Sequence, residues 1–380
     1  MNMLKSSLLF LFRIILSKKV WSLPKKNDLI ILDEEGSQRI IDFILGHDDC
    51  IVFEDRKKTI NIPILFLSIF NFLKYKNYSY RVTYIKYTEA KFAITYIDTR
   101  VFYSDILSFI PNCKLAFIQN GNRTESWNFW MPKDKKFFCD YYFTHQKSWS
   151  KFASKYLKSN YIESGHIAAN SFKVAKHKDI KRLQIVSEFG DYKYQTFKNK
   201  TFTFNEYFRK PAEFSLNVIE RFCIDNNIKL EIIGCSIDKY DKELAYYNSL
   251  LTKFDLLRRK NEHDSHRHLS NDAIICAHNS TLLHEAFGRG FRTAFFSIRG
   301  YFINEISFNF GWPEETADFG SFWANKPDKD QFNRILNYLF YVKETEWQQN
   351  LDTYKDYIMD YDYKNTIIKN VLKKEGLKIV

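Results

Sequence analysis

The sequence lacks the short motifs that mark several common enzyme classes. It contains no GxGxxG, no Walker A sequence, no GxSxG and no HExxH. These absences disfavour NAD-dependent dehydrogenases, P-loop kinases, serine esterases and zinc metalloproteases. It also has no Cys-x-x-Cys pair, and its six cysteines are scattered through apolar segments. We therefore expect reduced core thiols in a cytosolic protein.

No apolar run is long enough to cross a bilayer. The longest N-terminal run, Leu8 to Leu16, is interrupted by Arg13, and lysines flank it on both sides. It has no small-residue cleavage site before the lysines, which disfavours a signal peptide. Two interpretations of residues 1–24 stay open. The segment is either a basic amphipathic helix on an anionic membrane surface or a helix packed on the protein core.

The composition is that of a globular protein with a positive surface. Hydrophobic residues make up 45% and charged residues 27% of the 380 residues, enough for two domains. The formal net charge of +12 suits a negatively charged partner, namely anionic lipid, nucleic acid or a phosphorylated substrate. Because no DNA- or RNA-binding motif accompanies the charge, we expect no nucleic-acid partner.

Strand, polar turn and helix alternate along most of the chain, which predicts an α/β fold with parallel sheets covered on both faces. We expect a first α/β domain over residues 25–175 and a second over 176–345, with the link near the lysine cluster at 166–179. Residues 346–380 form a charged helical segment. Two such Rossmann-like domains facing a central cleft make up the GT-B arrangement.

The segment from Asp272 to Arg299 carries the strongest functional signal. It reads as a buried strand, the polar turn Asn279-Ser280-Thr281, a short helix and a second strand. Free amides at a helix start attract anions, so this turn predicts a phosphate site. The simpler alternative is an N-cap, which needs only one of these residues. One helical turn deeper, we expect Glu285 either to accept hydrogen bonds from ribose hydroxyls or to neutralise the local charge of His278 or Arg289.

An acidic turn, Asp33-Glu34-Glu35-Gly36, follows the first predicted strand. A general base needs a carboxylate that projects into a cleft, and Gly36 permits the tight turn that would place one there. The alternative is an ordinary acidic helix start, favoured by the helix dipole. We expect the base among Asp33, Glu34 and Glu35, with a slight preference for Glu35 because it adjoins Gly36.

Other polar residues end strands or follow them, where ligands of α/β proteins bind. We expect the donor or acceptor sugar to contact Asp98, Gln119, Asn120, Gly121, Arg123 and Arg299. We expect the nucleotide to contact Glu188, Gly190 and His278. The histidines His263, His266 and His268 have metal-like spacing, but their cationic neighbours favour a solvated loop.

These segments resemble the bacterial surface-carbohydrate biosynthesis proteins, a GT-B-like transferase group. The resemblance spans nearly the whole chain from about Asp28, and its most specific part is NST-x-x-x-EA-x-x-RG. The matching pieces are LDEEGS, ITYIDT (94–99), FIQNGNR (117–123), DYYFTH (140–145), HNSTLLHEAFGRGFRTAFFSIR, FGWPEE (310–315) and GSFW (320–323).

A narrower similarity concerns the donor. Bacterial GT-B sialyltransferases carry a D/E-D/E-G motif that supplies the base and a Ser/Thr pair that holds the CMP phosphate. Asp33 to Gly36 and Ser280-Thr281 are similar in type and placement. Those enzymes also carry a His-Pro pair, which is absent here, and His278 is the candidate replacement. The resemblance implies transfer of a nonulosonic acid from its CMP form.

The resulting expectation is a cytoplasmic, membrane-peripheral glycosyltransferase for capsule or lipopolysaccharide. It would use a nucleotide-sugar donor and a glycan or glycolipid acceptor, with no metal and no other cofactor. A CDP-alditol phosphotransferase of the teichoic-acid type stays open as a second enzymatic interpretation. A non-catalytic, membrane-peripheral assembly protein with a degenerate nucleotide fold stays open as a third.

Overall fold

The structure is a computed structural model that describes residues 16–379 except 55, 57–58, 125–136, 177, 236, 262–263 and 315. Most of the expected N-terminal helix, residues 1–15, therefore lies outside the described residues. Residues Lys18–Val20 form strand β1, which pairs in parallel with β4 (Thr59–Asn61). None of the helices in the described part combines the length and apolar character needed to span a bilayer.

The first domain is built on a six-stranded parallel sheet in the order β3-β2-β5-β6-β7-β8. Its strands are β2 (Leu29–Leu32), β3 (Ile51–Phe53), β5 (Phe92–Thr95), β6 (Lys114–Ile118), β7 (Phe137–Thr144) and β8 (Leu157–Glu163). All four residues of β2 are buried, and they alternate between the cores on the two faces of the sheet. Burial on both faces explains why these strands read as continuous apolar runs.

The second domain contains another six-stranded parallel sheet, in the order β13-β12-β9-β14-β15-β16. Its strands are β9 (Arg182–Val186), β12 (Lys229–Ile233), β13 (Asp255–Leu257), β14 (Ala273–Ala277), β15 (Thr293–Phe296) and β16 (Trp323–Ala324). The order in which successive strands are added to this sheet reverses between β9 and β14. Ligands of α/β proteins bind at such a reversal. The corresponding reversal of the first sheet lies between β2 and β5.

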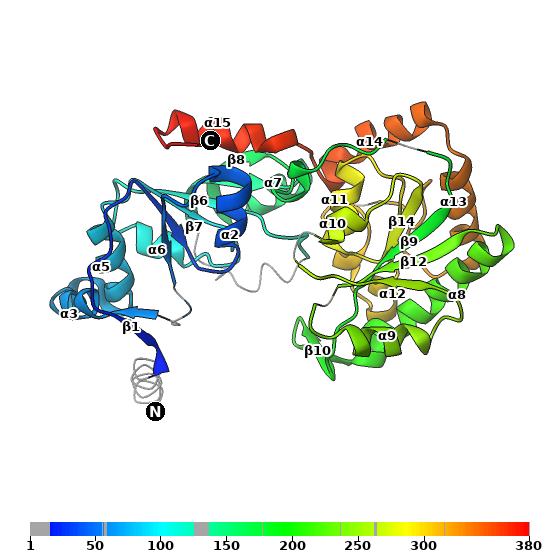
Figure 1. Ribbon diagram of the computed structural model, residues 1–380, viewed down its shortest axis with the longest axis horizontal. Helices are drawn as coiled ribbons and strands as arrows, with labels where there is room; N and C mark the ends of the chain where they lie inside the picture. Colours follow the sequence, from blue (N-terminus) through cyan, green and yellow to red (C-terminus); the bar gives the residue numbers. More distant parts are fainter. Residues whose placement is uncertain are drawn as a thin grey trace.

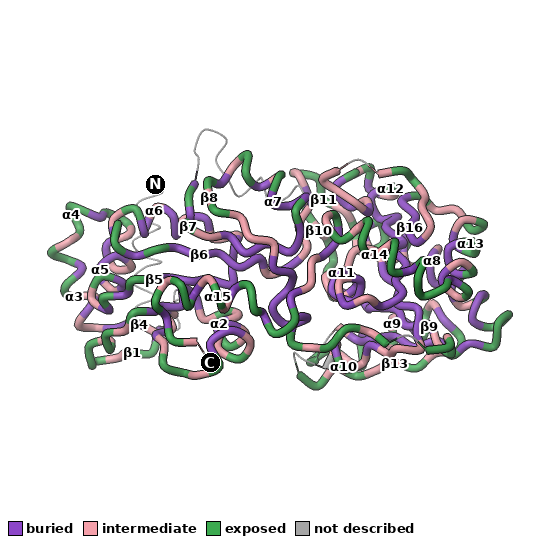
Figure 2. Tube along the Cα trace, turned by 90° about the horizontal axis from the view of Figure 1, so that it is seen from above, coloured by how far each residue is buried: buried purple, intermediate pink, exposed green. Residues whose placement is uncertain are grey.

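Helices cover both sheets, and the strands they cover are largely buried (Figure 2). Those of the first domain are α2 (Ser37–Ile40), continued by a π-helical turn (Ile41–Leu45), α3 (Ile62–Phe70), α4 (Phe72–Tyr75), α5 (Ser79–Thr88), α6 (Tyr103–Leu107) and α7 (Lys147–Ala153). The rest are a π-helical turn (Asn205–Arg209), α8 (Lys210–Asp225), α9 (Tyr240–Asn248), α10 (Asp264–His268), α11 (Thr281–Gly288), α12 (Arg299–Ile303), α13 (Lys329–Tyr341), α14 (Glu344–Ile358) and α15 (Thr366–Lys374). A hairpin, β10 (Tyr194–Phe197) and β11 (Lys200–Thr203), projects from the second domain.

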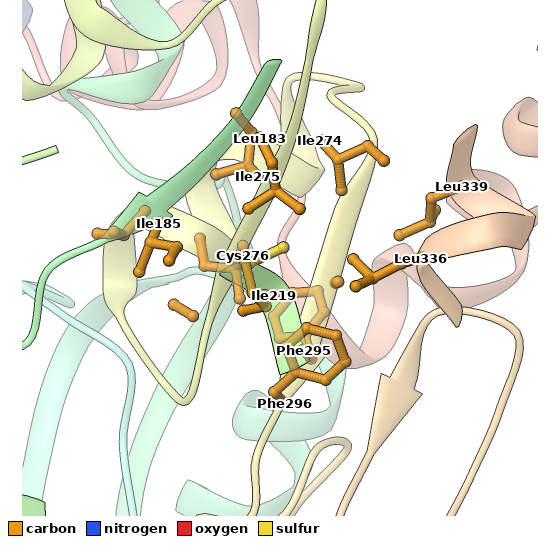
Figure 3. Close-up of a cluster of buried hydrophobic side chains, with 14 of the residues drawn as sticks. Leu183, Ile185, Ile219, Ile274, Ile275, Cys276, Phe295, Phe296, Leu336 and Leu339 are labelled. Atoms are coloured by element: carbon orange, nitrogen blue, oxygen red, sulfur yellow. The ribbon is translucent and has the colours of Figure 1, made fainter. Parts of the chain in front are cut away.

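The cysteines are unpaired and mostly buried, as the core of the second domain illustrates. Figure 3 places Cys276 on β14 among Ile185, Ile219 and Phe295. All six cysteines are free; four are buried and two partly buried. Burial raises the pKa of the Cys223 thiol to about 12, which keeps it protonated and unreactive at neutral pH.

The chain passes between the two domains twice. It leaves the first sheet after β8, and it returns after α14 so that α15 lies over the first domain (Figure 1). Ile368 and Leu372 of α15 belong to the core on one face of the first sheet. The two passages are bonded to each other, since the Asn170 side chain donates to Oδ1 of Asn365 at 2.8 Å and both residues are fully buried.

Candidate functional site at the domain boundary

The turn before α11 lies at the reversal point of the second sheet. It directly follows β14, and α11 begins at Thr281 with Ser280 as its N-cap residue. The Ser280 side chain makes no capping hydrogen bond. The helix start predicted from the sequence is therefore present, and its first-turn amides are not capped by a side chain. Such a terminus favours an anion.

Glu188 lies in the loop after the neighbouring strand β9 and contacts the same turn. Its carboxylate accepts a 2.7 Å hydrogen bond from the Asn279 backbone N–H and pairs with the buried Arg299. Burial favours the protonated acid, but Arg299 and His278 outweigh it and hold the pKa of Glu188 below its ordinary value. In this structure Arg299 therefore neutralises an internal carboxylate. Gly190 lies farther along the same loop, with Tyr192 against it.

The two predicted loops of opposite domains meet at this point. The backbone N–H of Asn122 donates to Oγ1 of Thr281 at 3.1 Å, and its side-chain amide donates to Oδ1 of Asn279 at 2.8 Å. A Cβ on Gly121 would lie 3.4 Å from the Thr281 hydroxyl. The structure thus brings the turn after β6 against the turn after β14.

Three of the predicted sugar contacts are engaged inside the first domain. Asp98 is fully buried and forms an ion pair with Arg123, and it also accepts a hydrogen bond from Tyr142 at 2.5 Å. Gln119 is fully buried, and its side-chain oxygen accepts from the backbone of His145 at 2.9 Å. These contacts hold the turn after β6 in shape. Asn120 instead lines the pocket between the domains.

The acidic turn occupies the reversal point of the first sheet, immediately after β2. Asp33 is fully buried and binds two guanidinium groups, with Arg56 Nε at 3.1 Å and Arg100 Nε at 3.0 Å. Glu35, the residue preferred from the sequence, pairs with Arg56 and its side chain is 51% exposed. Glu34 has a buried Oε1 with no hydrogen-bond partner among the described residues. This carboxylate oxygen is therefore not engaged by the protein residues that the structure describes.

A chain of close contacts leads from this turn across the domain boundary. Gly36 lies against the ring of Tyr96, whose hydroxyl lies 2.7 Å from Nε2 of His166. His166 Nδ1 lies 3.0 Å from Glu285, and the other oxygen of Glu285 lies 3.1 Å from His266 Nε2. Tyr96 belongs to the first domain and Glu285 to α11 of the second.

These groups are buried, which sets their protonation. Burial lowers the pKa of His266 to about 4 and raises the pKa of Tyr96 to about 12. Burial disfavours ionised Glu285, but the imidazoles of His166 and His266 hold its pKa below the ordinary value. The Glu285 carboxylate thus lies between the imidazoles of His166 and His266 in the lining of the boundary pocket. The expectation of a solvated histidine loop is wrong for His266, which is buried on α10.

An open pocket of about 560 Å³ of empty space lies on this boundary. The first domain and the segment that follows it supply one wall, and the loop after β13 with helices α10 and α11 supplies the other. The lining residues are Arg39, Asn120, His166, Ala168, Arg259, Ser265, His266, Thr281, Leu282 and Glu285. Two guanidinium groups and the start of α11 make the pocket suited to a phosphate-bearing ligand.

The same pocket holds a group that has the chemistry of a metal site. One ligand atom each of His166, His266 and Glu285 lies within 4.8 Å of the others, and all three residues are buried. Two imidazoles and a carboxylate suit a divalent transition metal. The two arginines in the lining oppose a bound cation, however, and Glu285 already contacts both imidazoles.

A family model described as "putative O-antigen biosynthesis protein" matches residues 116–376, which is more than half of the chain. The chain belongs to this family. The matched range includes the turns after β6 and β14 but not the acidic turn. No curated protein matches the chain.

Two solved structures show that this O-antigen biosynthesis family member has a known fold. One is a protein assigned as a UDP-N-acetylglucosamine 2-epimerase from Listeria monocytogenes, with a TM-score of 0.53 and 10% identity, covering 92% of this chain and 97% of that one. The other is a glycosyltransferase from Rickettsia africae, with a TM-score of 0.52 and 10% identity, covering 92% and 99%. The predicted fold, two α/β domains of the GT-B type, is confirmed.

Sequence reasoning missed several residues of the pocket in this family member. Arg39, His166 and Arg259 are isolated in the sequence and carry no motif, so only the fold reveals them. Asn122 lies in the segment FIQNGNR (117–123), and a polar residue next to Gly121 after a strand could have indicated a contact with the other domain.

Proposed function

We propose that this protein is a glycosyltransferase that takes a sugar from a nucleotide donor held in the boundary pocket. The observation that carries the proposal is the start of α11, uncapped by its N-cap side chain, in a pocket that also presents Arg39 and Arg259. Membership in an O-antigen biosynthesis family supports a surface polysaccharide as the product. The GT-B fold supports binding of the nucleotide at the second domain.

Each lining group has a role in this proposal. The amides at the start of α11 and the two guanidinium groups bind the donor phosphate and stabilise the charge that develops on it as it leaves. Glu285 lies within the pocket and is ionised, so it accepts hydrogen bonds from the ribose hydroxyls. The imidazoles of His166 and His266 orient that carboxylate.

The reaction needs a base on the side of the first domain. We assign Glu34, which takes the proton from the acceptor hydroxyl as that oxygen bonds to the anomeric carbon. The bond from the anomeric carbon to the phosphate oxygen breaks, and the nucleotide leaves with the bonding electrons. Protein cations supply the positive charge at the phosphate, so we propose that transfer needs no metal.

The finer donor assignment is a CMP-activated nonulosonic acid. Its support is the similarity of the acidic turn and the Ser280-Thr281 pair to the motifs of bacterial sialyltransferases. We further propose that the acceptor is a glycan or glycolipid and that the protein works at the inner face of the cytoplasmic membrane.

Calorimetric titration with CMP, CDP, UDP and GDP tests the proposal directly. We expect CMP to bind, and we expect Arg259→Gln to weaken its binding roughly tenfold through loss of a charge-assisted contact. Glu213→Gln is the control, because this half-exposed residue of α8 does not line the pocket. Binding of CDP with a phosphorus-containing product would identify a phosphotransferase instead. Failure of all four nucleotides to bind would leave the assembly-protein interpretation.

A further inference from the structure

The outer face of α3 and α4 is apolar, which is the reverse of an ordinary surface helix. Phe70 is 86% and Leu73 92% exposed. We call the following exposed side chains together the α3–α4 surface: Phe66, Leu67, Ile69, Phe70, Phe72 and Leu73. Single exposed apolar residues are common, but a contiguous set of this kind marks an interaction site.

The inner face of α3 shows that this orientation is fixed by the fold. Its buried residues are Ile64 and Ser68. Ser68 donates its hydroxyl to a backbone oxygen at 2.7 Å, and its own carbonyl accepts from Ser79 of α5 at 2.5 Å. Asn61 caps the helix start and also bonds to the backbone of Ser22 at 2.7 Å. Rotation of the helix to bury its phenylalanines would break these bonds.

The chain around this surface carries only positive charge. Between residues 56 and 88 there is no Asp or Glu, whereas seven residues are Lys or Arg. Residues 16–27 add four lysines and again no acid. Lys74 and Lys76 are exposed at the end of α4. Trp21, next to β1, is 73% exposed, and β1 pairs with the strand that leads into α3.

We propose that the α3–α4 surface binds an anionic lipid bilayer, with the phenylalanines and leucines entering the acyl region and the lysines contacting lipid headgroups. Apolar side chains bordered by lysines and a tryptophan are what an interfacial membrane contact requires. The excess of lysine and arginine over acidic residues in these two segments favours a negatively charged surface over a neutral one. The surface is at the end of the first domain that lies away from the second domain (Figure 1). A bilayer contact there leaves the boundary pocket uncovered.

Flotation with lipid vesicles tests this. The full-length protein is mixed with vesicles of phosphatidylcholine alone or with added phosphatidylglycerol. We expect binding to require phosphatidylglycerol and to fall as salt rises. The double variant Phe70→Ser/Leu73→Ser should bind at least about tenfold more weakly, because each inserted side chain contributes more than a factor of ten when fully buried. Lys74→Gln/Lys76→Gln should bind a few-fold more weakly.

The matched control is Ile306→Ser/Tyr341→Ser, which removes two comparably exposed apolar side chains from the second domain. It should bind as well as the unaltered chain. Three outcomes would overturn the proposal: equal binding to neutral vesicles, undiminished binding of Phe70→Ser/Leu73→Ser, or loss of binding only when residues 1–15 are removed. A dimer that Phe70→Ser/Leu73→Ser converts to a monomer, with vesicle binding unchanged, would assign the surface to contact between copies. Nucleotide titration of the same variants keeps this result separate from the glycosyltransferase proposal.

Discussion

The side-chain amide of Asn122 donates a 2.8 Å hydrogen bond to Oδ1 of Asn279, and the two residues belong to different domains. The Asn122 backbone N–H makes a second bond, to Oγ1 of Thr281. One residue of the first domain thus donates hydrogen bonds to both ends of the turn that opens α11. The contact between the two domains and the shape of the turn that opens α11 are therefore linked.

The first prediction concerns this contact. Asn122→Ala and Asn279→Ala each remove one partner of the bond, so the double variant should cost less than the sum of the two. We expect a coupling free energy of about 1 kcal/mol in a double-mutant cycle followed by chemical denaturation. Asn77→Ala, at an exposed position of the first domain, should add independently to either change. Strict additivity of Asn122→Ala and Asn279→Ala would show that the contact does not form in solution.

The second prediction separates the acidic residues. Glu34→Gln should lower the turnover number about 10²-fold or more, because a positioned base contributes factors of this size. Glu35→Gln, which loses an ion pair with Arg56 on a half-exposed side chain, should lower it only a few-fold. The assay is the rate of sugar transfer by each variant at saturating substrate. The reverse ranking of the two variants would restore Glu35 as the base.

The strands and the helix start at Asn279 to Thr281 were predictable because each depends on local pattern. Apolar runs with polar ends gave the two parallel sheets, and Ser280 beside Thr281 gave the start of α11. The contact of Glu285 with His166 and His266 was not predictable, because it joins residues from three distant segments. The pairing of Arg299 with Glu188 escaped prediction for the same reason.

The third prediction uses two glycines with similar backbone conformations. Gly36 has φ +75°, and a Cβ there would lie 2.3 Å from the Tyr96 ring. Gly376 has φ +82° and nothing within 4 Å of such a Cβ. Gly376→Ala should cost about 1 kcal/mol, the strain of a left-handed alanine alone. Gly36→Ala should cost about 1–3 kcal/mol more, because overpacking is added. Equal melting temperatures for the two variants would mean that Tyr96 is free to move away.

The fourth prediction is acid sensitivity. Burial lowers the pKa of His266 to about 4, so the unfolded chain binds a proton below pH about 6.5 that the folded chain does not. Stability should therefore fall as the pH drops from about 6.5 to about 4. The loss due to this one residue at pH 5 is about 2 kcal/mol. Glu285, whose pKa is lowered, adds a further loss only below about pH 4.5.

His266→Gln keeps an N–H for Glu285 but does not titrate, so its stability should fall less between pH 7 and 5. Thermal unfolding over this range measures the difference. A profile for His266→Gln that parallels the unaltered protein would rule out His266 as the source.

The fifth prediction concerns metal. If the arginines rather than a cation neutralise the donor phosphate, transfer should survive treatment with EDTA, and elemental analysis should find no stoichiometric metal. His166→Gln should then change nucleotide affinity without changing metal content. Zinc or manganese at one equivalent, lost in His166→Gln, would instead assign a metal to the group of His166, His266 and Glu285.

The return of the chain to the first domain bears on how the protein is made. The core on one face of the first sheet includes Ile368, Leu372 and Leu377, which leave the ribosome after the whole of the second domain. The second domain, in contrast, is contained between the two passages and has all of its strands beforehand. During synthesis the domain begun first should therefore be the one completed last. Until then its half-covered sheet is the part of the nascent chain most exposed to aggregation and most in need of a chaperone.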